Sequence, residues 1–288
     1  MPDRSQHAHN TVTTQFVSAG NNIKFAYRRF GAAQGVPLVL LHHFRATMDL
    51  WDPAVTDALA ASRPVILVDN AGIGRSGGQA PDTIQQMAAD IAAFIEALGL
   101  EQVDVLGFSI GGMVAQQLAL DSPKLVRRVI LVGTGPRGGE GMQAFTSDVT
   151  EAATHLDIAA EDILYLFYTP SHSSQARGRA SLDRIFSRTD REPATGVETM
   201  TAQAKALAEW GVFATGHRYE ALGSIPHPVL VVNGSNDLMV PTVNSLILQQ
   251  RLPNAQLIIY PDSGHAAHFQ YPEMFVDDAA RFLDRPED

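Results

Sequence analysis

The chain has 288 residues, of which 45% are hydrophobic and 18% charged, and it contains no cysteine. This composition is that of an ordinary globular protein, and it excludes disulfide bonds, iron–sulfur clusters, zinc–cysteine sites and a cysteine nucleophile. The 21 basic and 31 acidic residues leave a net charge of −10, which argues against a nucleic-acid partner because Lys and Arg bind such partners. No signal-type segment or membrane-length apolar run is visible, so we expect a cytoplasmic location and no membrane partner.

A polar N-terminal tail, residues 1–11, precedes two β-rich runs. The runs cover residues 11–18 and 23–30, and the Gly-Asn sequence between them is typical of a tight turn. We therefore predict an antiparallel hairpin at the start of the folded body.

Short apolar runs then alternate with helical patterns. The β-branched runs at 37–41, 65–69, 103–106 and 129–132 are typical of strands that are buried on both faces. Helical patterns lie between them at 50–61, 83–98 and 110–120. This alternation predicts an α/β fold with a doubly wound, mostly parallel sheet.

The alternation stops after residue 132 and resumes near the C-terminus. Residues 135–223 hold helical patterns without a convincing strand, whereas further strands are expected at 228–233 and 257–260. Helices are expected near 243–252 and 272–283. We therefore predict a core over residues 12–134 and 224–288, with a helical lid, residues 135–223, inserted after the sixth strand.

The strongest local motif lies between a predicted strand and a predicted helix. It is Gly107-Phe108-Ser109-Ile110-Gly111, which matches the G-x-S-x-G pattern of a nucleophilic serine on a sharp turn. Glycines two residues before and after such a serine allow the strand and the helix to approach each other. Ser109 is therefore the candidate nucleophile.

A serine hydroxyl needs a base to accept its proton, and the base needs an acid to orient it. Asp237 follows the predicted strand at 228–233, and His265 follows the last predicted strand. Both loops are expected to leave the same edge of the sheet as Ser109. Asp262 and Glu140 are competing acids, and Asp237 is preferred because it follows a strand within a G-x-x-D sequence.

Together, several motifs resemble the α/β-hydrolase superfamily, in particular its branch of esterases, lactonases and cofactor-free haloperoxidases. The motifs are L-L-H-H-F (40–44), D-N-A-G-I-G-R-S (69–76), G-F-S-I-G-G-M (107–113), N-G-S-N-D-L-M-V-P (233–241) and S-G-H-A-A-H (263–268). The resemblance spans about residues 12–283 and implies the α/β-hydrolase fold.

The resemblance also implies roles for individual residues. It assigns the catalytic triad to Ser109, Asp237 and His265, and it assigns an oxyanion hole to the backbone N–H groups of Phe44 and Ile110. One departure is His43, which stands where the family usually has glycine after its third strand.

The other histidines and the glycine-rich turns raise the question of pocket, metal and cofactor sites. His42, His43, His268 and Trp210 are candidates for the pocket wall. We predict no metal site, because the histidine pair at 265 and 268 lacks the accompanying Glu of a helical zinc motif. The segments 72–77 and 133–138 match G-x-G-x-x-G, but proline interrupts the helix that should follow, so no cofactor is expected.

These features predict a serine hydrolase that cleaves a small, largely apolar carboxylic ester or lactone through an acyl-enzyme. The expected partner is a small-molecule substrate, and homo-oligomerisation stays open. The same triad would also serve a C–C bond hydrolase or a cofactor-free haloperoxidase or perhydrolase. A ligand receptor with this fold is the non-enzymatic alternative.

Overall fold

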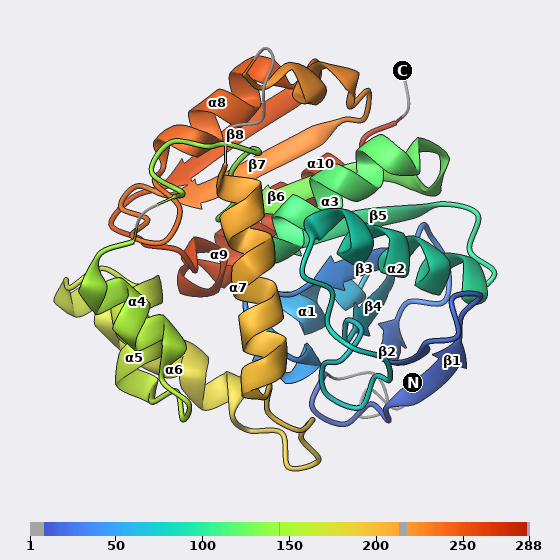
Figure 1. Ribbon diagram of the computed structural model, residues 1–288, viewed down its shortest axis with the longest axis horizontal. Helices are drawn as coiled ribbons and strands as arrows, with labels where there is room; N and C mark the ends of the chain where they lie inside the picture. Colours follow the sequence, from blue (N-terminus) through green and yellow to red (C-terminus); the bar gives the residue numbers. More distant parts are fainter. Residues whose placement is uncertain (1–8, 144, 213–217, 287–288) are drawn as a thin grey trace.

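The structure, a computed structural model, describes residues 9–143, 145–212 and 218–286, and residues 1–8 of the predicted tail lie outside it. One eight-stranded sheet crosses the molecule in the order β1-β2-β4-β3-β5-β6-β7-β8 (Figure 1). Strand β2 pairs antiparallel with β1 and β4, whereas the remaining pairs, from β4–β3 to β7–β8, are parallel. The predicted doubly wound, mostly parallel sheet is confirmed.

Each strand overlaps a predicted run; the first is shorter than the run at 11–18, and β5, β6 and β8 are longer than predicted. Their bounds are β1 Gln15–Ser18, β2 Lys24–Gly31, β3 Leu38–Leu41, β4 Pro64–Val68, β5 Val103–Phe108, β6 Val126–Val132, β7 Val229–Gly234 and β8 Ala255–Tyr260.

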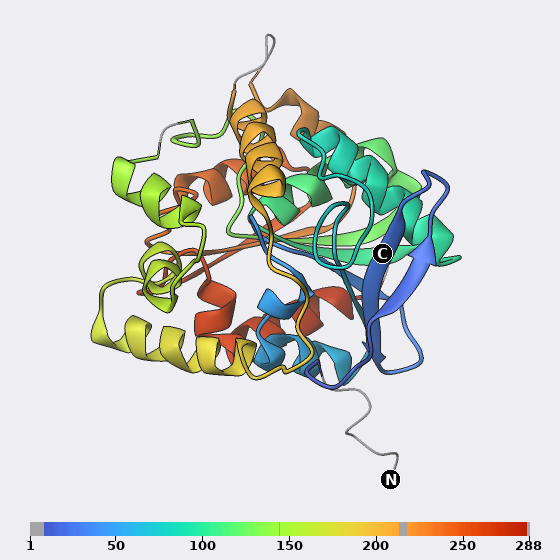
Figure 2. The ribbon, with the colours of Figure 1, turned by 60° about the horizontal axis from the view of Figure 1, so that its bottom comes forward.

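Helices cover both faces of the sheet, as Figure 2 shows with the sheet nearly edge-on. On one face lie α2 (Ile84–Ala97), α3 (Ile110–Asp121) and α8 (Val243–Arg251), and on the other lie α1 (Pro53–Ala60), α9 (Ala267–Gln270) and α10 (Pro272–Leu283). The short 3-10 helices are η2 (Met48–Leu50), η3 (Pro123–Leu125) and η4 (Glu220–Ser224). None of the helices in the described residues has the length and apolar character that crossing a bilayer requires.

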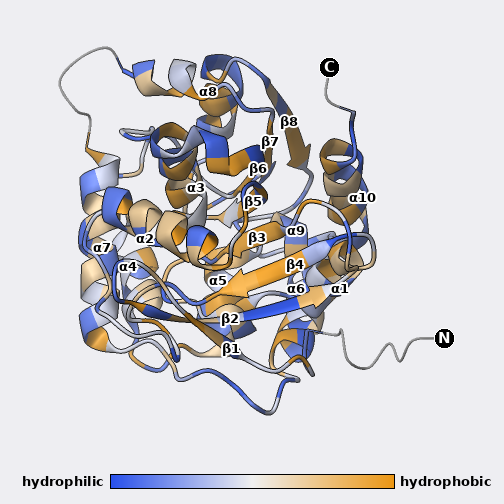
Figure 3. Cartoon of the chain, turned by 90° about the vertical axis from the view of Figure 1, so that its right-hand side faces the viewer, coloured by the Kyte–Doolittle hydropathy of each residue, from blue (hydrophilic) through white to orange (hydrophobic). Residues whose placement is uncertain are grey.

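Two hydrophobic cores result from the alternation of side chains along the strands. In β3, Val39 and Leu41 join the core beneath α2 and α3, and Leu38 and Leu40 join the core beneath α1 and α10. All four side chains are fully buried, and β3 and β4 appear as hydrophobic ribbons in Figure 3. Burial on both faces explains why these strands are continuously apolar.

In the described residues, four α-helices lie between β6 and β7, within the segment predicted as an insertion. They are α4 (Ser147–Thr154), α5 (Ala160–Phe167), α6 (His172–Ile185) and α7 (Val197–Gly211). Helices α4, α5 and α6 lie together to one side, whereas α7 runs across the front of the molecule in the view of Figure 1. The described residues between 135 and 223 include no strand.

The end of the predicted polar tail packs on α1. His9 is buried, its ring Nδ1 lies 3.0 Å from the hydroxyl of Thr56, and its amide donates to Asp57 at 2.6 Å. Burial lowers the pKa of His9 to about 3, so the ring is neutral at ordinary pH. His9 therefore belongs to the folded body, although the composition of the segment predicted a polar tail up to residue 11.

A buried ion cluster ties the inserted segment to the sheet. The guanidinium of Arg28, on β2, is fully buried and contacts Asp49 at 2.5 Å and Glu192 at 2.8 Å. Glu192 lies between α6 and α7, so the cluster joins the insertion to the edge of the sheet. Charges buried in this way are stable only while each has its partner.

We predict that Arg28→Met lowers the free energy of unfolding by about 3 kcal/mol, because it leaves two carboxylates buried without this guanidinium. The matched control is Arg29→Met on the same strand, where the side chain is exposed. The control should change stability by less than about 0.5 kcal/mol in urea denaturation. Equal stability of the two variants would contradict the role given to the cluster.

Candidate active site

Ser109 occupies the turn between β5 and α3 with a backbone conformation that is rare for a residue with a side chain. Its φ is +57° and its ψ is −119°. A Cβ atom added to Gly107 would overlap the Gly111 carbonyl, and one added to Gly111 would overlap the Leu41 carbonyl. The two flanking glycines are therefore required by close backbone contacts, and the serine is held on a strained turn.

His265 and Asp237 form a buried pair at the ends of β8 and β7. His265 Nδ1 lies 2.9 Å from Asp237 Oδ2. The other carboxylate oxygen of Asp237 accepts the amides of Met239 at 2.8 Å and Val240 at 2.9 Å, which fixes its orientation. A carboxylate oxygen accepts, so Nδ1 of His265 is the donor in this pair and Nε2 faces away from Asp237.

The two competing acids, Glu140 and Asp262, interact with residues other than His265. Glu140 forms an ion pair with Arg218 at 2.7 Å. Asp262 accepts hydrogen bonds from Thr169 at 2.7 Å and Ser171 at 2.6 Å. Of the three carboxylates, Asp237 is the one in contact with the His265 ring.

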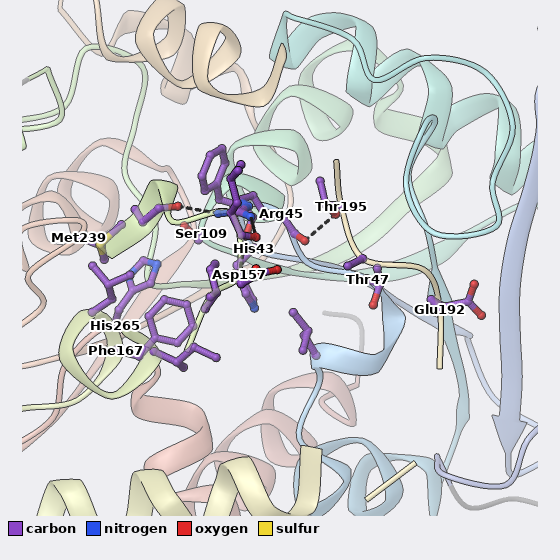
Figure 4. A pocket seen from close by; sticks show the side chains of 18 of the residues that line it. His43, Arg45, Thr47, Ser109, Asp157, Phe167, Glu192, Thr195, Met239 and His265 are labelled. Atoms are coloured by element: carbon purple, nitrogen blue, oxygen red, sulfur yellow. Dashed lines mark hydrogen bonds between the residues drawn. The ribbon is translucent and has the colours of Figure 1, made fainter. Parts of the chain in front are cut away.

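Ser109 and His265 line one cavity of about 370 Å³. In Figure 4, Ser109, His265 and Met239 lie at one end, while Thr47 and Glu192 lie toward the other. Much of the wall is apolar and comes from the inserted helices and their connections, namely Ala153, Leu156, Ile158, Ile163, Leu166, Phe167 and Phe186. The cavity thus joins a hydroxyl and an imidazole to an apolar wall.

Two backbone amides near Ser109 are available as donors. Ile110 is the first residue of α3, and Phe44 lies in the loop after β3 and lines the cavity. Neither amide donates a hydrogen bond to another group in the described part of the chain. The Ile110 amide also lies at the N-terminus of a helix, where the helix dipole favours negative charge.

Arg45 connects this loop to the insertion, a role that the sequence motifs did not reveal. Its guanidinium donates to the carbonyls of Ala153, His155 and Leu156 at 2.7–3.1 Å. Its amide donates to the side chain of Gln203 on α7 at 2.7 Å. The loop that carries Phe44 is therefore held by two separate parts of the inserted segment.

His43 lines the cavity, as expected for a pocket residue. Its ring packs edge-on against Phe108 and Phe167, each with a centroid distance of 5.1 Å. Burial, reinforced by the neighbouring rings of His265 and His42, lowers the pKa of His43 to about 3. The ring is therefore neutral over the whole physiological range.

Three other side chains suggested for the pocket do not line it in the structure. His42 lies deeper, where its Nδ1 accepts a hydrogen bond from the Trp51 indole at 3.1 Å. His268 is fully buried against Phe108 and Phe269. Trp210 donates to a backbone carbonyl, that of Gly135, at 3.2 Å and joins the core on the α7 side. Each of these side chains is buried in the core and does not reach the cavity. The spacing of residues along the chain could not distinguish such a side chain from one in the pocket wall.

Comparison with known proteins agrees with this architecture. A model of the alpha/beta hydrolase fold family matches residues 36–272. An alpha/beta hydrolase fold protein from Chitinophaga pinensis is 39% identical, covers 97% of this chain and 100% of its own, and superposes with a TM-score of 0.91.

Two curated relatives differ in the activity that their names describe. A pimeloyl-(acyl-carrier protein) methyl ester esterase from Nitrosomonas europaea is 31% identical, covering 84% of this chain and 93% of its own. A protein of Mycobacterium tuberculosis named as a non-heme bromoperoxidase is 29% identical, covering 87% of this chain and 94% of its own. The chain belongs to the α/β-hydrolase fold family.

We predict that a fluorophosphonate probe labels Ser109 and that Asp237→Asn slows this labelling about 100-fold or more, because the imidazole loses its orienting carboxylate. The rate is measured by mass spectrometry of the modified protein. The matched control is Glu140→Gln, which should label at the wild-type rate because Glu140 pairs with Arg218. The reverse pattern would show that Glu140 supplies the acid.

Proposed function

We propose that this protein is a serine hydrolase that cleaves small, largely apolar carboxylic esters or lactones through an acyl-enzyme. One observation carries the proposal. A serine on a left-handed turn and an imidazole paired with a buried carboxylate open into the same apolar cavity. Such a combination activates a hydroxyl for attack on a carbonyl carbon.

The proposed reaction begins when Ser109 Oγ attacks the acyl carbonyl and His265 Nε2 accepts the hydroxyl proton. The amides of Phe44 and Ile110 hold the oxyanion that forms. His265 then returns the proton to the departing alcohol oxygen, which leaves an ester on Ser109. Water, deprotonated by His265, hydrolyses this ester and releases the acid, while Asp237 stabilises the imidazolium without being protonated.

The size and lining of the cavity support a small apolar substrate. Its volume of about 370 Å³ lies near the lower end of the range for small-molecule sites. Because the inserted segment supplies most of the apolar lining, we propose that residues 135–223 act as a lid over Ser109. The esterase named among the relatives supports an ester bond as the target.

The relative named as a bromoperoxidase favours a second candidate, a cofactor-free perhydrolase. In that reaction hydrogen peroxide replaces water in the second step, and a peracid leaves instead of an acid. C–C bond cleavage by the same triad and ligand reception without turnover are the remaining alternatives. Chromatography of the products from esters, with and without peroxide, distinguishes the candidates.

We predict that the wild-type protein hydrolyses 4-nitrophenyl butyrate with an initial burst of nitrophenol, since the acyl-enzyme accumulates. Ser109→Ala should abolish the burst and reduce kcat by about 10⁴-fold or more. Stopped-flow absorbance gives both quantities. Full activity in Ser109→Ala would refute a covalent route through this residue.

A further inference from the structure

His43 occupies a position at which the resemblance leads one to expect glycine, and it places an imidazole beside the proposed nucleophile. This imidazole is separate from the His265–Asp237 pair, and the reaction described above does not use it. The inference drawn from it rests on the proposed function and concerns which substrates the site prefers.

The proton of the His43 ring lies on Nδ1. Its Nδ1 lies 3.1 Å from the backbone carbonyl oxygen of Phe44. A carbonyl oxygen can only accept a hydrogen bond, so Nδ1 is the donor and carries the proton. Because the low pKa keeps the ring neutral, there is no second ring proton. Nε2 is therefore an unprotonated acceptor.

Nε2, the other ring nitrogen of His43, is accessible from the cavity. His43 is half-buried and lines the cavity. Its Nε2 has no hydrogen-bond partner among the described residues. It is not closed off from solvent, unlike the buried side-chain atoms that lack a partner. Both ring nitrogens of His268, by contrast, are closed off. The free acceptor of His43 therefore opens into the cavity.

Two aromatic rings lie between His43 and His265 and contact both. Phe108 packs against His43 at 5.1 Å and against His265 at 4.9 Å. Phe167 packs against the same two rings at 5.1 Å and 5.3 Å. Two aromatic rings thus hold the two imidazoles close to each other, and Figure 4 shows both in the wall around Ser109.

The partners of His43 exclude two other roles for it. It has no carboxylate to stabilise a protonated ring, so it is unsuited to act as the base. Its cavity-facing nitrogen carries no proton, so it cannot donate to an oxyanion. An unprotonated nitrogen in an apolar wall can instead bind a hydroxyl or N–H group, and leaving such an acceptor unpaired disfavours other ligands.

We propose that His43 is a specificity-determining residue whose Nε2 accepts a hydrogen bond from the substrate. The preferred substrates are then esters or lactones whose acyl part carries a hydroxyl or an amide N–H near the scissile carbonyl. One hydrogen bond of this kind corresponds to a preference of about tenfold in kcat/KM.

The experiment compares methyl esters that differ only in the donor. These are the 2-hydroxy, 3-hydroxy, 2-methoxy and 3-methoxy butanoates, each as both enantiomers, with the released acid titrated at constant pH. We expect one hydroxy ester to exceed its methoxy partner about tenfold in kcat/KM. His43→Phe, which keeps the ring stacking and lacks the acceptor, should bring this ratio near one.

Two further variants separate the hydrogen bond from general effects on the pocket. His43→Gln restores an acceptor and should recover part of the preference. Asp157→Asn alters an exposed polar group in the same cavity and should leave the hydroxy-to-methoxy ratio as in the wild type. A ratio near one in the wild type, or an unchanged ratio in His43→Phe, would overturn the proposal.

A binding measurement tests the role of His43 even if the wild type cleaves none of these esters. That absence of cleavage would refute the proposed function, not the role of His43. In ¹⁵N-labelled Ser109→Ala protein, the ring nitrogens of His43 report its tautomer. We expect Nδ1 to be protonated, and the Nε2 resonance to shift with a hydroxy ester more than with its methoxy partner. A protonated Nε2, or equal shifts, would refute the role of His43.

Discussion

A contact between two backbones sets the position of the Ser109 turn relative to the loop that follows β3. Gly111, in the first turn of α3, lies so close to the Leu41 carbonyl at the end of β3 that no side chain fits there. This contact places the first turn of α3 against the loop that follows β3. It therefore sets the position of the Ile110 amide relative to the loop that carries Phe44. Two residues before Gly111, Ser109 projects from the sheet on a turn with positive φ. The nucleophile and both proposed oxyanion donors therefore depend on one steric requirement.

The sequence predicts the sheet well, and it predicts which edge of the sheet the three proposed triad residues share, for a physical reason. Strands buried on both faces need continuous apolar runs, and these are readable locally. Once the strands are parallel, every loop after a strand leaves from the same edge, so Ser109, Asp237 and His265 are expected together although they lie far apart in the chain. The preference for Asp237 over Asp262 agrees with the contacts, because Asp262 is engaged by Thr169 and Ser171.

What the sequence could not predict depends on tertiary partners. His43 and His42 are adjacent, yet one faces the cavity and the other accepts a hydrogen bond from a buried tryptophan. The role of Arg45 depends on carbonyls more than 100 residues away, which no local pattern reveals. Likewise, Glu192 looks like a loop carboxylate until the fold buries it beside Arg28. Each of these roles is set by the packing of distant segments.

Two imidazoles close together can do different work because their Nδ1 atoms face different acceptors. His265 faces the carboxylate of Asp237, which stabilises the positive ring that forms when a proton is taken up. His43 faces the uncharged carbonyl of Phe44 and no carboxylate, so protonation gains little and the ring stays neutral. A neutral neighbour also spares the His265 imidazolium a like charge at close range. In the proposed mechanism, the Asp237 carboxylate enables His265 to act as the base. The Phe44 carbonyl holds the proton of His43 on Nδ1, so that Nε2 can accept a hydrogen bond from the substrate.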